Sequence, residues 1–265
     1  MSDSSKFTAI VLAGDRGPDD PVAKSQGASC KALSKVGGRE LLLRVLDVLL
    51  ASPNIKRTCI VGPAVEHIDS CPELERLLTN KSVLWIPPSR TPCTSAQAAL
   101  ESVGDSHPLL ITTADHGFLD QKVLQDFLNA AESHDADTVT GLVRYDQVMS
   151  EFPQGKRTAL RFKGNSYCGC NLFAIRTSDG SKAVSYWRQV ETLRKTPWRI
   201  ASVVGIPTLL SFVLGRLTAD AAMLALSKKM GAKVGYVEVP HARAAIDIDT
   251  PADCELVENV LSERS

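Results

Sequence analysis

Apolar and polar positions along the first half of the chain follow two alternating patterns. Short apolar runs, the pattern of buried strands, occur at 7–13, 58–62, 82–87 and 108–114. The segments between them, 39–51, 64–78 and 94–103, have apolar residues at the spacing of amphipathic helices. Strands that alternate with helices predict a parallel sheet wound by right-handed crossovers. Ligands of such a sheet bind at the carboxyl ends of the strands, where the loops open.

The pattern changes after a predicted helix at 119–133. Three strand-like runs, at 138–145, 158–162 and 167–175, have little helix between them, which favours an antiparallel edge. Residues 178–230 have helical spacing, and the chain closes with strand-like runs at 233–239 and 244–248 and a helix from Pro251 to about Ser262. We therefore expect one three-layer α/β domain over residues 1–265, with a mostly parallel, Rossmann-like sheet. Its first half extends to about residue 135, and its second half begins at about residue 136.

The composition limits the kinds of partner and the compartment. Thirty basic and thirty acidic side chains give a formal net charge of zero, so the chain lacks the long-range attraction that nucleic-acid binders use. We expect no polynucleotide partner. The seven cysteines include no CxxC pair, and Cys168-Gly-Cys170 has the wrong spacing for a zinc knuckle. Free thiols, together with an N-terminal segment that lacks an export signal, lead us to expect a cytoplasmic protein.

A long glycine-containing loop follows the first predicted strand. Between Ala13 and Lys31 it holds Gly14, Gly17 and Gly27, and loops of this length in α/β proteins are usually functional. Glycines let backbone N–H groups approach phosphate oxygens closely, and a lysine at the end of the loop adds a point charge. The alternative is a surface loop with a solvated lysine.

The letters VLAGDRG, then CKAL and GGRELLLRVLDVL, resemble the opening motif LAGGxGxRM…PKxL of the MobA-like NTP transferases. These nucleotidyltransferases are related to molybdopterin guanylyltransferase and to the sugar-phosphate and polyol-phosphate cytidylyltransferases. The resemblance implies an Mg²⁺-dependent enzyme that joins an NTP to a phosphorylated acceptor and releases pyrophosphate. It also implies that the first half binds the nucleotide and the second half the acceptor. The nucleotide-binding residues it implies are Leu12, Ala13, Gly14, Asp15, Arg16, Gly17, Lys31 and Ser95.

Three positions depart from this motif. Asp15 replaces a glycine, Asp19 stands where the motif has arginine, and Cys30 replaces the proline before the lysine. An aspartate beside a triphosphate repels it, so either Arg16 or Lys24 provides the phosphate contact, or Asp15 faces the nucleobase.

Carboxylates follow two predicted strands. Asp115 comes directly after the run 108–114, and Asp247 and Asp249 lie in IDIDTPAD, where an extended chain places both on one face. Magnesium prefers oxygen ligands and takes one or two carboxylates from a protein. The resemblance implies that Asp115 and Asp247 bind this metal, with Asp249 in reserve, and that Lys31, Asp115 and Asp247 are catalytic.

Some residues near these carboxylates can also be interpreted as structural. Asp247, Thr250, Pro251 and Asp253 match the family motif (D/N)xxTPxD, but Asp249 or Thr250 can also cap the last helix, with Asp253 near its positive end. We expect capping for Asp253 and ligation for Asp247. His116 is expected to be a structural neighbour or an acceptor contact, and not the catalytic base.

The resemblance also implies residues that contact the base and the acceptor. Ser95 in TPCTSAQAAL falls where the family has a small polar residue beneath the nucleobase, which favours CTP over GTP; the alternative is an ordinary N-cap. Gly169 and Asn171 in YCGCNLFAI fall where the family binds its acceptor; the alternative is a β-bulge and an edge residue.

Two other segments have their own interpretations. The apolar segment 198–217 predicts a helical hairpin on the core or on a second subunit of a homodimer. The alternative is peripheral contact with lipid through Trp198, Arg199 and Arg216. Asp135-Ala-Asp137 looks like the metal-binding DxD of glycosyltransferases, but it follows a predicted helix, so we expect a solvated turn.

Two competing functions remain open from the sequence. One is a metal-dependent glycosyltransferase that uses a nucleotide sugar on a related sheet. The other is an inactive nucleotide-binding module that regulates a partner, which the departures at Asp15, Asp19 and Cys30 make credible.

Overall fold

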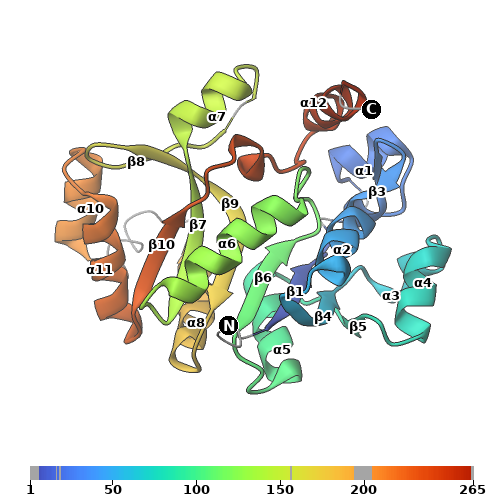
Figure 1. Ribbon diagram of the computed structural model, residues 1–265, viewed down its shortest axis with the longest axis horizontal. Coiled ribbons are helices and arrows are strands. Elements are labelled where there is room, and N and C mark those ends of the chain that lie inside the picture. Colours follow the sequence, from blue (N-terminus) through green and yellow to red (C-terminus); the bar gives the residue numbers. More distant parts are fainter. Residues whose placement is uncertain (1–5, 16, 18, 156, 194–204, 264–265) are drawn as a thin grey trace.

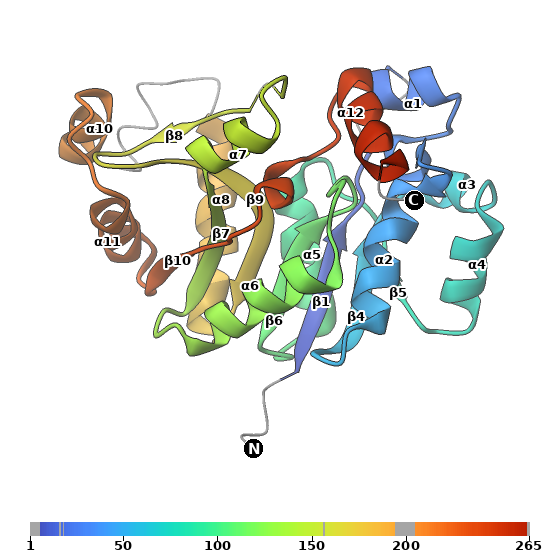
Figure 2. The same ribbon diagram turned by 45° about the horizontal axis from the view of Figure 1, so that its top comes forward.

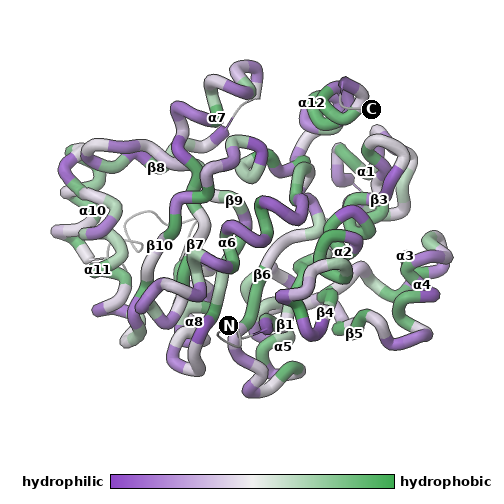
Figure 3. Tube along the Cα trace, in the orientation of Figure 1, coloured by the Kyte–Doolittle hydropathy of each residue, from purple (hydrophilic) through white to green (hydrophobic). Residues whose placement is uncertain are grey.

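The apolar runs of the first half form the parallel centre of one sheet. The computed structural model describes residues 6–263 except 16, 18, 156 and 194–204 (Figures 1 and 2). β1 (Phe7–Leu12) is buried along its whole length and pairs in parallel with β4 (Ile55–Val61) and β6 (Leu109–Thr113). β5 (Leu84–Ile86) extends the sheet beyond β4. Figure 3 shows hydrophobic residues along these central strands, as a sheet covered on both faces requires.

Helices cover both faces of this sheet. Alternate residues of β1 belong to different cores: Ala9 and Val11 pack with residues of α2 (Leu41–Ala51) and α6 (Gln121–Ser133), whereas Ile10 and Leu12 pack with residues of α5 (Pro92–Val103). The predicted three-layer α/β fold with a mostly parallel sheet is therefore confirmed.

The second half supplies the antiparallel strand. Its strands are β7 (Thr138–Arg144), β8 (Leu160–Arg161), β9 (Ser166–Ile175) and β10 (Val234–Glu238). The long strand β9 runs antiparallel to both β6 and β7. β10 pairs in parallel with β7 and forms one edge of the sheet. The order is β10-β7-β9-β6-β1-β4-β5. The expected antiparallel edge is therefore wrong: because β7 and β10 pair beyond it, the antiparallel strand β9 lies inside the sheet and joins the two halves.

The remaining elements surround this sheet. They are α1 (Pro21–Gln26), η1 (Lys31–Leu33), β2 (Lys35–Val36), β3 (Arg39–Glu40), α3 (Val65–Ile68), α4 (Pro72–Thr79), α7 (Tyr145–Glu151), η2 (Asp179–Ser181), α8 (Lys182–Leu193), α10 (Ile206–Val213), α11 (Ala219–Met230), η3 (Ala242–Ala245) and α12 (Pro251–Ser262). All seven cysteines are buried free thiols. Within the described ranges, no helix is both long enough and apolar enough to cross a membrane.

Two expected elements differ in the structure. The helix predicted over 64–78 is split into α3 and α4, because Pro72 cannot continue a helix and instead begins the second one. The strand predicted over 244–248 is wrong: the segment begins in η3 and forms only an isolated bridge between Asp247 and His116. Its apolar residues are buried as in a strand, but its partner is the short turn after β6, which offers too few backbone groups for a ladder.

Candidate active site

A cavity of about 760 Å³ opens at the carboxyl ends of the central strands. The first half contributes the loop after β1, the turn η1, the start of α5 and the end of β6. The second half contributes β9, α8 and the segment before α12. The ends of β1 and β6 are adjacent, since Leu12 pairs with Thr113 and the N–H of Ala114 donates to the carbonyl of Leu12. Parallel pairing therefore brings the glycine loop and Asp115 together, and the volume is that of a small-molecule site.

Lys31 lies deep in this cavity between two carboxylates. Its side chain is 7% exposed, and its Nζ is 2.5 Å from Asp115 Oδ2 and 2.9 Å from Asp249 Oδ1. Burial alone would lower the pKa of Lys31, but the neighbouring carboxylates raise it overall. The alternative of a solvated surface lysine is therefore wrong. The preceding Cys30 is fully buried, and burial raises the pKa of its thiol to about 11, so it stays neutral and packs in the core.

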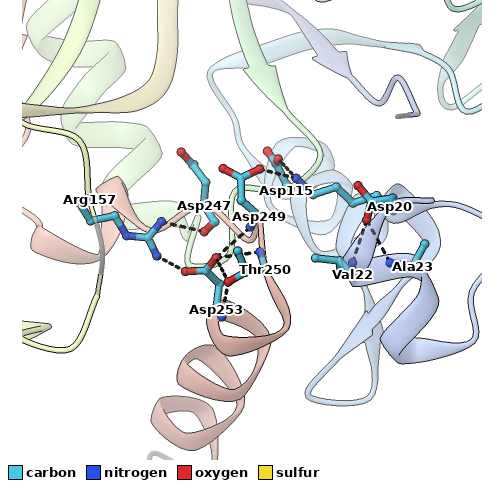
Figure 4. A network of polar contacts seen from close by, with 10 residues as sticks. Asp20, Val22, Ala23, Asp115, Arg157, Asp247, Asp249, Thr250 and Asp253 are labelled. Carbon is cyan, nitrogen blue, oxygen red and sulfur yellow. Dashed lines mark hydrogen bonds and ion pairs between the residues drawn. The ribbon is translucent and has the colours of Figure 1, made fainter. Parts of the chain in front are cut away.

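Asp247 completes an acidic group at the cavity wall (Figure 4). Asp115 Oδ1 and Asp247 Oδ1 are both buried and form no hydrogen bond within the described chain. Burial, together with the nearby carboxylates of Asp115 and Asp249, raises the pKa of Asp247 to about 7. Three carboxylates thus face one ammonium group, and two negative charges remain when all are ionised.

These oxygens fit a magnesium ion as a pair and not as a triad. Within the described residues, no three Asp, Glu, His or Cys side chains are arranged to hold a metal. Lys31 binds one oxygen of Asp115 and one of Asp249, whereas Asp115 Oδ1 and Asp247 Oδ1 are buried and have no hydrogen-bond partner in the described chain. Since Mg²⁺ commonly takes only one or two protein carboxylates and keeps several waters, this pair fits it.

The turn before α12 is organised by its own side chains. Thr250 is the N-cap of α12 and forms a capping box with Asp253. Oδ2 of Asp253 accepts hydrogen bonds from the N–H groups of Asp249 and Thr250 and from the Thr250 hydroxyl. The expected capping role of Asp253 is confirmed, and Asp249 is not the cap.

The wall near α5 contains Ser95, but this residue does not cap the helix. Thr91 caps α5 and Pro92 occupies its first turn, so the alternative of Ser95 as N-cap is wrong. The Ser95 hydroxyl instead accepts a hydrogen bond from the N–H of Ser89 at 3.0 Å and holds the preceding loop against the cavity. Arg90 in this loop also lines the cavity. It is the only cationic side chain besides Lys31 among the described lining residues.

The glycine loop reaches the cavity in part. Leu12, Ala13, Gly14 and Asp15 line it, whereas Gly17 does not. One carboxylate oxygen of Asp15 is buried without a partner, and the other lies 3.9 Å from His67 Nε2. Arg16 lies outside the described residues.

The other candidate phosphate contact lies away from the cavity. Lys24, in α1, has an exposed side chain that forms an ion pair with Asp19 at 2.7 Å, and neither residue lines the cavity. The sequence did not single out Asp20, which is buried and caps α1 by accepting from the N–H groups of Val22 and Ala23 (Figure 4).

A bulge in β9 brings Asn171 to the cavity. Thr140 of β7 pairs with Phe173 and Leu142 pairs with Gly169, so three residues of β9 lie opposite one residue of β7. Asn171, inside this bulge, has a φ of 50° and lines the cavity. The bulge alternative is confirmed, but the strand is not at the sheet edge, and Gly169 does not line the cavity.

His116 lies behind the carboxylates. It is 2% exposed, does not line the cavity, and has no hydrogen-bond partner for either ring nitrogen within the described chain. Burial lowers its pKa to about 4, so the imidazole is neutral. This position agrees with the expectation that His116 is a structural neighbour of the carboxylates. Its backbone forms an isolated β-bridge with Asp247.

Several lining or supporting residues carried no sequence signal. Phe173 and Trp187 line the second-half wall, with ring centroids 6.0 Å apart. Arg157 contacts the segment before α12 from a loop about ninety residues earlier in the chain. An alternating strand pattern contains Phe173 and a helical pattern contains Trp187, but neither pattern says which face meets a cavity.

Two other predicted features lie away from the cavity. Asp135 and Asp137 are in the turn between α6 and β7, and Asp137 accepts from the Lys233 N–H and the Thr177 hydroxyl. In the segment 198–217, Trp198 and Arg199 lie outside the described residues, and α10 exposes Ile206, Leu210 and Val213. Contact of this segment with lipid or with a second subunit stays a prediction.

Comparison with known proteins adds an independent line of observation. A model of the MobA-like NTP transferase domain matches residues 9–164. A structure titled as a hypothetical transferase from Thermus thermophilus is similar with a TM-score of 0.77 and 26% identity, over 94% of this chain and 99% of that one. No curated protein matches the chain.

Two further solved structures share the fold. One is 4-diphosphocytidyl-2C-methyl-D-erythritol synthase from Anaerococcus prevotii, with a TM-score of 0.61 and 14% identity over 98% of this chain and 97% of that one. The other is CMP:2-keto-3-deoxy-manno-octonic acid synthetase complexed with CTP, with a TM-score of 0.60 and 12% identity over 98% of this chain and 100% of that one.

Proposed function

The chain belongs to the MobA-like NTP transferase family, and from this premise we propose that it is an Mg²⁺-dependent nucleotidyltransferase that joins CTP to a phosphorylated acceptor and releases pyrophosphate. One observation carries the proposal. Asp115 and Asp247, distant in sequence, line the same cavity beside the buried Lys31, and each has a buried oxygen without a hydrogen-bond partner in the described chain.

The transfer forms one phosphorus–oxygen bond and breaks another. An oxygen of the acceptor phosphate attacks the α-phosphorus, and the bond from that phosphorus to the β-phosphate oxygen breaks, so pyrophosphate leaves with the electron pair. The protein contributes positioning and charge neutralisation. When bound by Asp115 and Asp247, Mg²⁺ would supply positive charge at the phosphate oxygens.

Lys31 is proposed to bind the phosphates of the substrate. Its ammonium group is already inside the cavity, held by Asp115 and Asp249. A positive charge at this depth offsets the negative charge of the phosphates, which is more effective than at the surface because water screens it less. Asp249 then serves to hold Lys31, with metal ligation as its reserve role.

The nucleotide is proposed to lie along the first-half wall. The backbone from Leu12 to Asp15 and the loop held by Ser95 form this wall. Arg90, which forms no ion pair with an acidic residue of the described chain, is available for the triphosphate. CTP is preferred over GTP in this proposal because both named enzymes with the same fold have cytidine nucleotides in their titles.

The acceptor is proposed to lie along the second-half wall. Asn171 offers an amide there, and Phe173 and Trp187 offer an aromatic surface. The cavity is large enough to hold a nucleotide and a small acceptor together, since about 760 Å³ is near the upper end of small-molecule sites. Gly169 is retained only as a candidate neighbour of the acceptor, because it does not line the cavity.

The test is a screen for pyrophosphate release. Purified protein is incubated with Mg²⁺, CTP or GTP, and a panel of sugar phosphates, polyol phosphates and phosphorylated cofactors, with Asp115→Asn as the inactive control. We expect one pyrophosphate for each nucleotide joined to an acceptor, with CTP the better donor. NTP binding in calorimetry without turnover on any acceptor would favour the regulatory module. Release of nucleoside diphosphate from a nucleotide sugar would favour the glycosyltransferase.

A further inference from the structure

We propose that Arg157 is a positioning residue that fixes the backbone carrying Asp247, and so holds this carboxylate in place for the divalent cation. The inference rests on the proposed function, because it concerns the same cation site. Arg157 lies in the loop between α7 and β8, outside every motif named in the sequence.

The guanidinium group of Arg157 joins the segment before α12, at Asp247, to the first turn of α12, at Asp253 (Figure 4). Its Nη1 donates to the backbone carbonyl of Asp247 at 3.1 Å, and its Nη2 donates to Oδ1 of Asp253 at 2.7 Å. The side chain is only 10% exposed, and its carboxylate partner 13%. A planar guanidinium group donates from separate nitrogens in fixed directions and so sets the separation of its two acceptors, whereas a lysine donates from one rotatable ammonium group and sets no such geometry.

Asp253 passes this constraint along the turn. While Oδ1 binds Arg157, Oδ2 accepts from the N–H groups of Asp249 and Thr250. One carboxylate therefore joins the arginine, the start of α12 and the backbone of Asp249. Asp249 in turn binds Lys31, so the contacts of Arg157 extend to the ammonium group of Lys31 inside the cavity.

The side chain of Asp247 does not fix its own direction. Its Oδ1 forms no hydrogen bond within the described residues, so the direction of the carboxylate depends on the backbone. On one side, this backbone is tied to the turn after β6: the N–H of Ile248 donates to the carbonyl of Asp115, and the N–H of Gly117 donates to the carbonyl of Ile246. Arg157 supplies the contact to the Asp247 carbonyl from the second half. Without this contact, the Asp247 peptide is held, within the described chain, only by the turn after β6, and the direction of its carboxylate is less fixed.

Metal affinity is sensitive to such outer contacts. Loss of a group that orients a metal ligand typically lowers metal affinity about 10- to 100-fold. The nucleotide itself is not expected to depend on Arg157, because this residue does not line the cavity.

The test measures Mn²⁺ binding by electron paramagnetic resonance, with the full-length protein and CTP present. The variants are Arg157→Gln, which removes the planar guanidinium group and its charge, and Arg157→Lys, which keeps the charge without the planar group. Arg144→Gln is the matched control, since Arg144 forms an ion pair with Asp146 at 2.6 Å outside the cavity. CTP affinity without metal is measured by calorimetry, and the fold is checked by circular dichroism.

We expect the Mn²⁺ dissociation constant to rise about 10- to 100-fold in Arg157→Gln and by a smaller factor in Arg157→Lys. Arg144→Gln should stay within about twofold, as should metal-free CTP affinity in all variants. Mn²⁺ binding by both folded Arg157 variants within about twofold of wild type would overturn the inference; if Arg157→Gln does not fold, Arg157→Lys decides. A wild-type protein that binds no Mn²⁺ would refute the proposed function itself, which is a different result.

Discussion

The two halves of the sheet build their walls of the cavity in different ways. In the first half, the cavity is lined by loops that directly follow parallel strands, such as Gly14 after β1 and Asp115 after β6. In the second half, the lining comes from a bulge inside β9, from one residue of α8 and from an irregular segment before α12. Regular topology is sufficient to place the first wall, whereas the second depends on local departures from regular structure.

This difference suggests a division of labour between the halves. The position of a loop after a parallel strand is set by the whole sheet, so the first wall suits a ligand part that is common to many enzymes, the nucleotide. Bulges and irregular segments change with a few residues, so the second wall suits the part that varies, the acceptor. The proposed cation site lies where the halves meet, with one carboxylate from each.

The largest effect is expected from removing either carboxylate of the proposed cation site. Asp115→Asn and Asp247→Ala should each lower kcat/KM by about 10³-fold, or about 4 kcal/mol, because each removes an anionic ligand for Mg²⁺. Alanine is the sharper substitution at Asp247, since the family motif (D/N)xxTPxD accepts asparagine at this position, where its amide oxygen can still bind a metal. Turnover is measured by pyrophosphate release, and Asp146→Asn, whose carboxylate lies outside the cavity, is the control.

The comparison between the variants decides whether both halves supply a ligand. Near-normal turnover of Asp247→Ala, with Asp115→Asn inactive, would mean that the first half alone binds the cation. The proposed division would then fail at its most important point.

The next largest effect is expected on stability, at the place where the two halves meet and His116 lies behind Asp115 and Asp247. Its pKa is lowered to about 4 in the folded protein because burial favours the neutral imidazole. An unfolded histidine has a pKa of about 6.5, so the unfolded state takes up the proton first as the pH falls. The stability that depends on the neutral ring is therefore fully present above pH 6.5 and is lost as the pH falls towards 4, by up to about 3 kcal/mol.

This dependence can be isolated with His116→Leu. The free energy of unfolding is measured by urea denaturation from pH 7 to pH 4, without divalent cations. Wild type should lose up to about 3 kcal/mol more than the variant over this range, because both proteins retain the same carboxylates. His107→Leu, at the opposite end of β6, controls for the loss of an imidazole. If the free energy of unfolding changed with pH equally in wild type and His116→Leu, the site around residue 116 would not exclude the charged imidazole.

Local and topological rules account for much of what the sequence could predict. The buried run Phe7–Leu12 has to be apolar on both faces because helices cover both. The start of α12 was predictable because Thr250 and Asp253 interact within one turn. Lys31 was predictable from a motif, although its two carboxylate partners follow in sequence by 84 and 218 residues.

The remaining features depend on contacts that no local pattern contains. The direction of Asn171 depends on how many residues of β9 fit between two pairs with β7. The predicted strand at 244–248 did not form because its neighbour is a turn, which the pattern of Ile246 and Ile248 cannot show. Arg157 looks like any loop arginine until the fold brings it to Asp247, 90 residues later. Such residues are specified by the tertiary structure, so a single sequence cannot reveal them.

The smallest effect is expected at the aromatic part of the second wall, and it is the most direct test of the division of labour. Trp187 is 37% exposed at the cavity and lies against Phe173 with an interplanar angle of 33°. Trp187→Ala should raise KM for the acceptor about 10-fold, or about 1.4 kcal/mol, through lost contact area, while KM for CTP stays within about twofold. Initial rates are measured with the acceptor varied at saturating CTP and then with CTP varied at saturating acceptor. Trp187→Phe should recover most of the acceptor affinity, since it restores a ring beside Phe173. An equal rise in both constants would mean that this wall serves the nucleotide as well, and that the two halves of the sheet do not separate the two substrates.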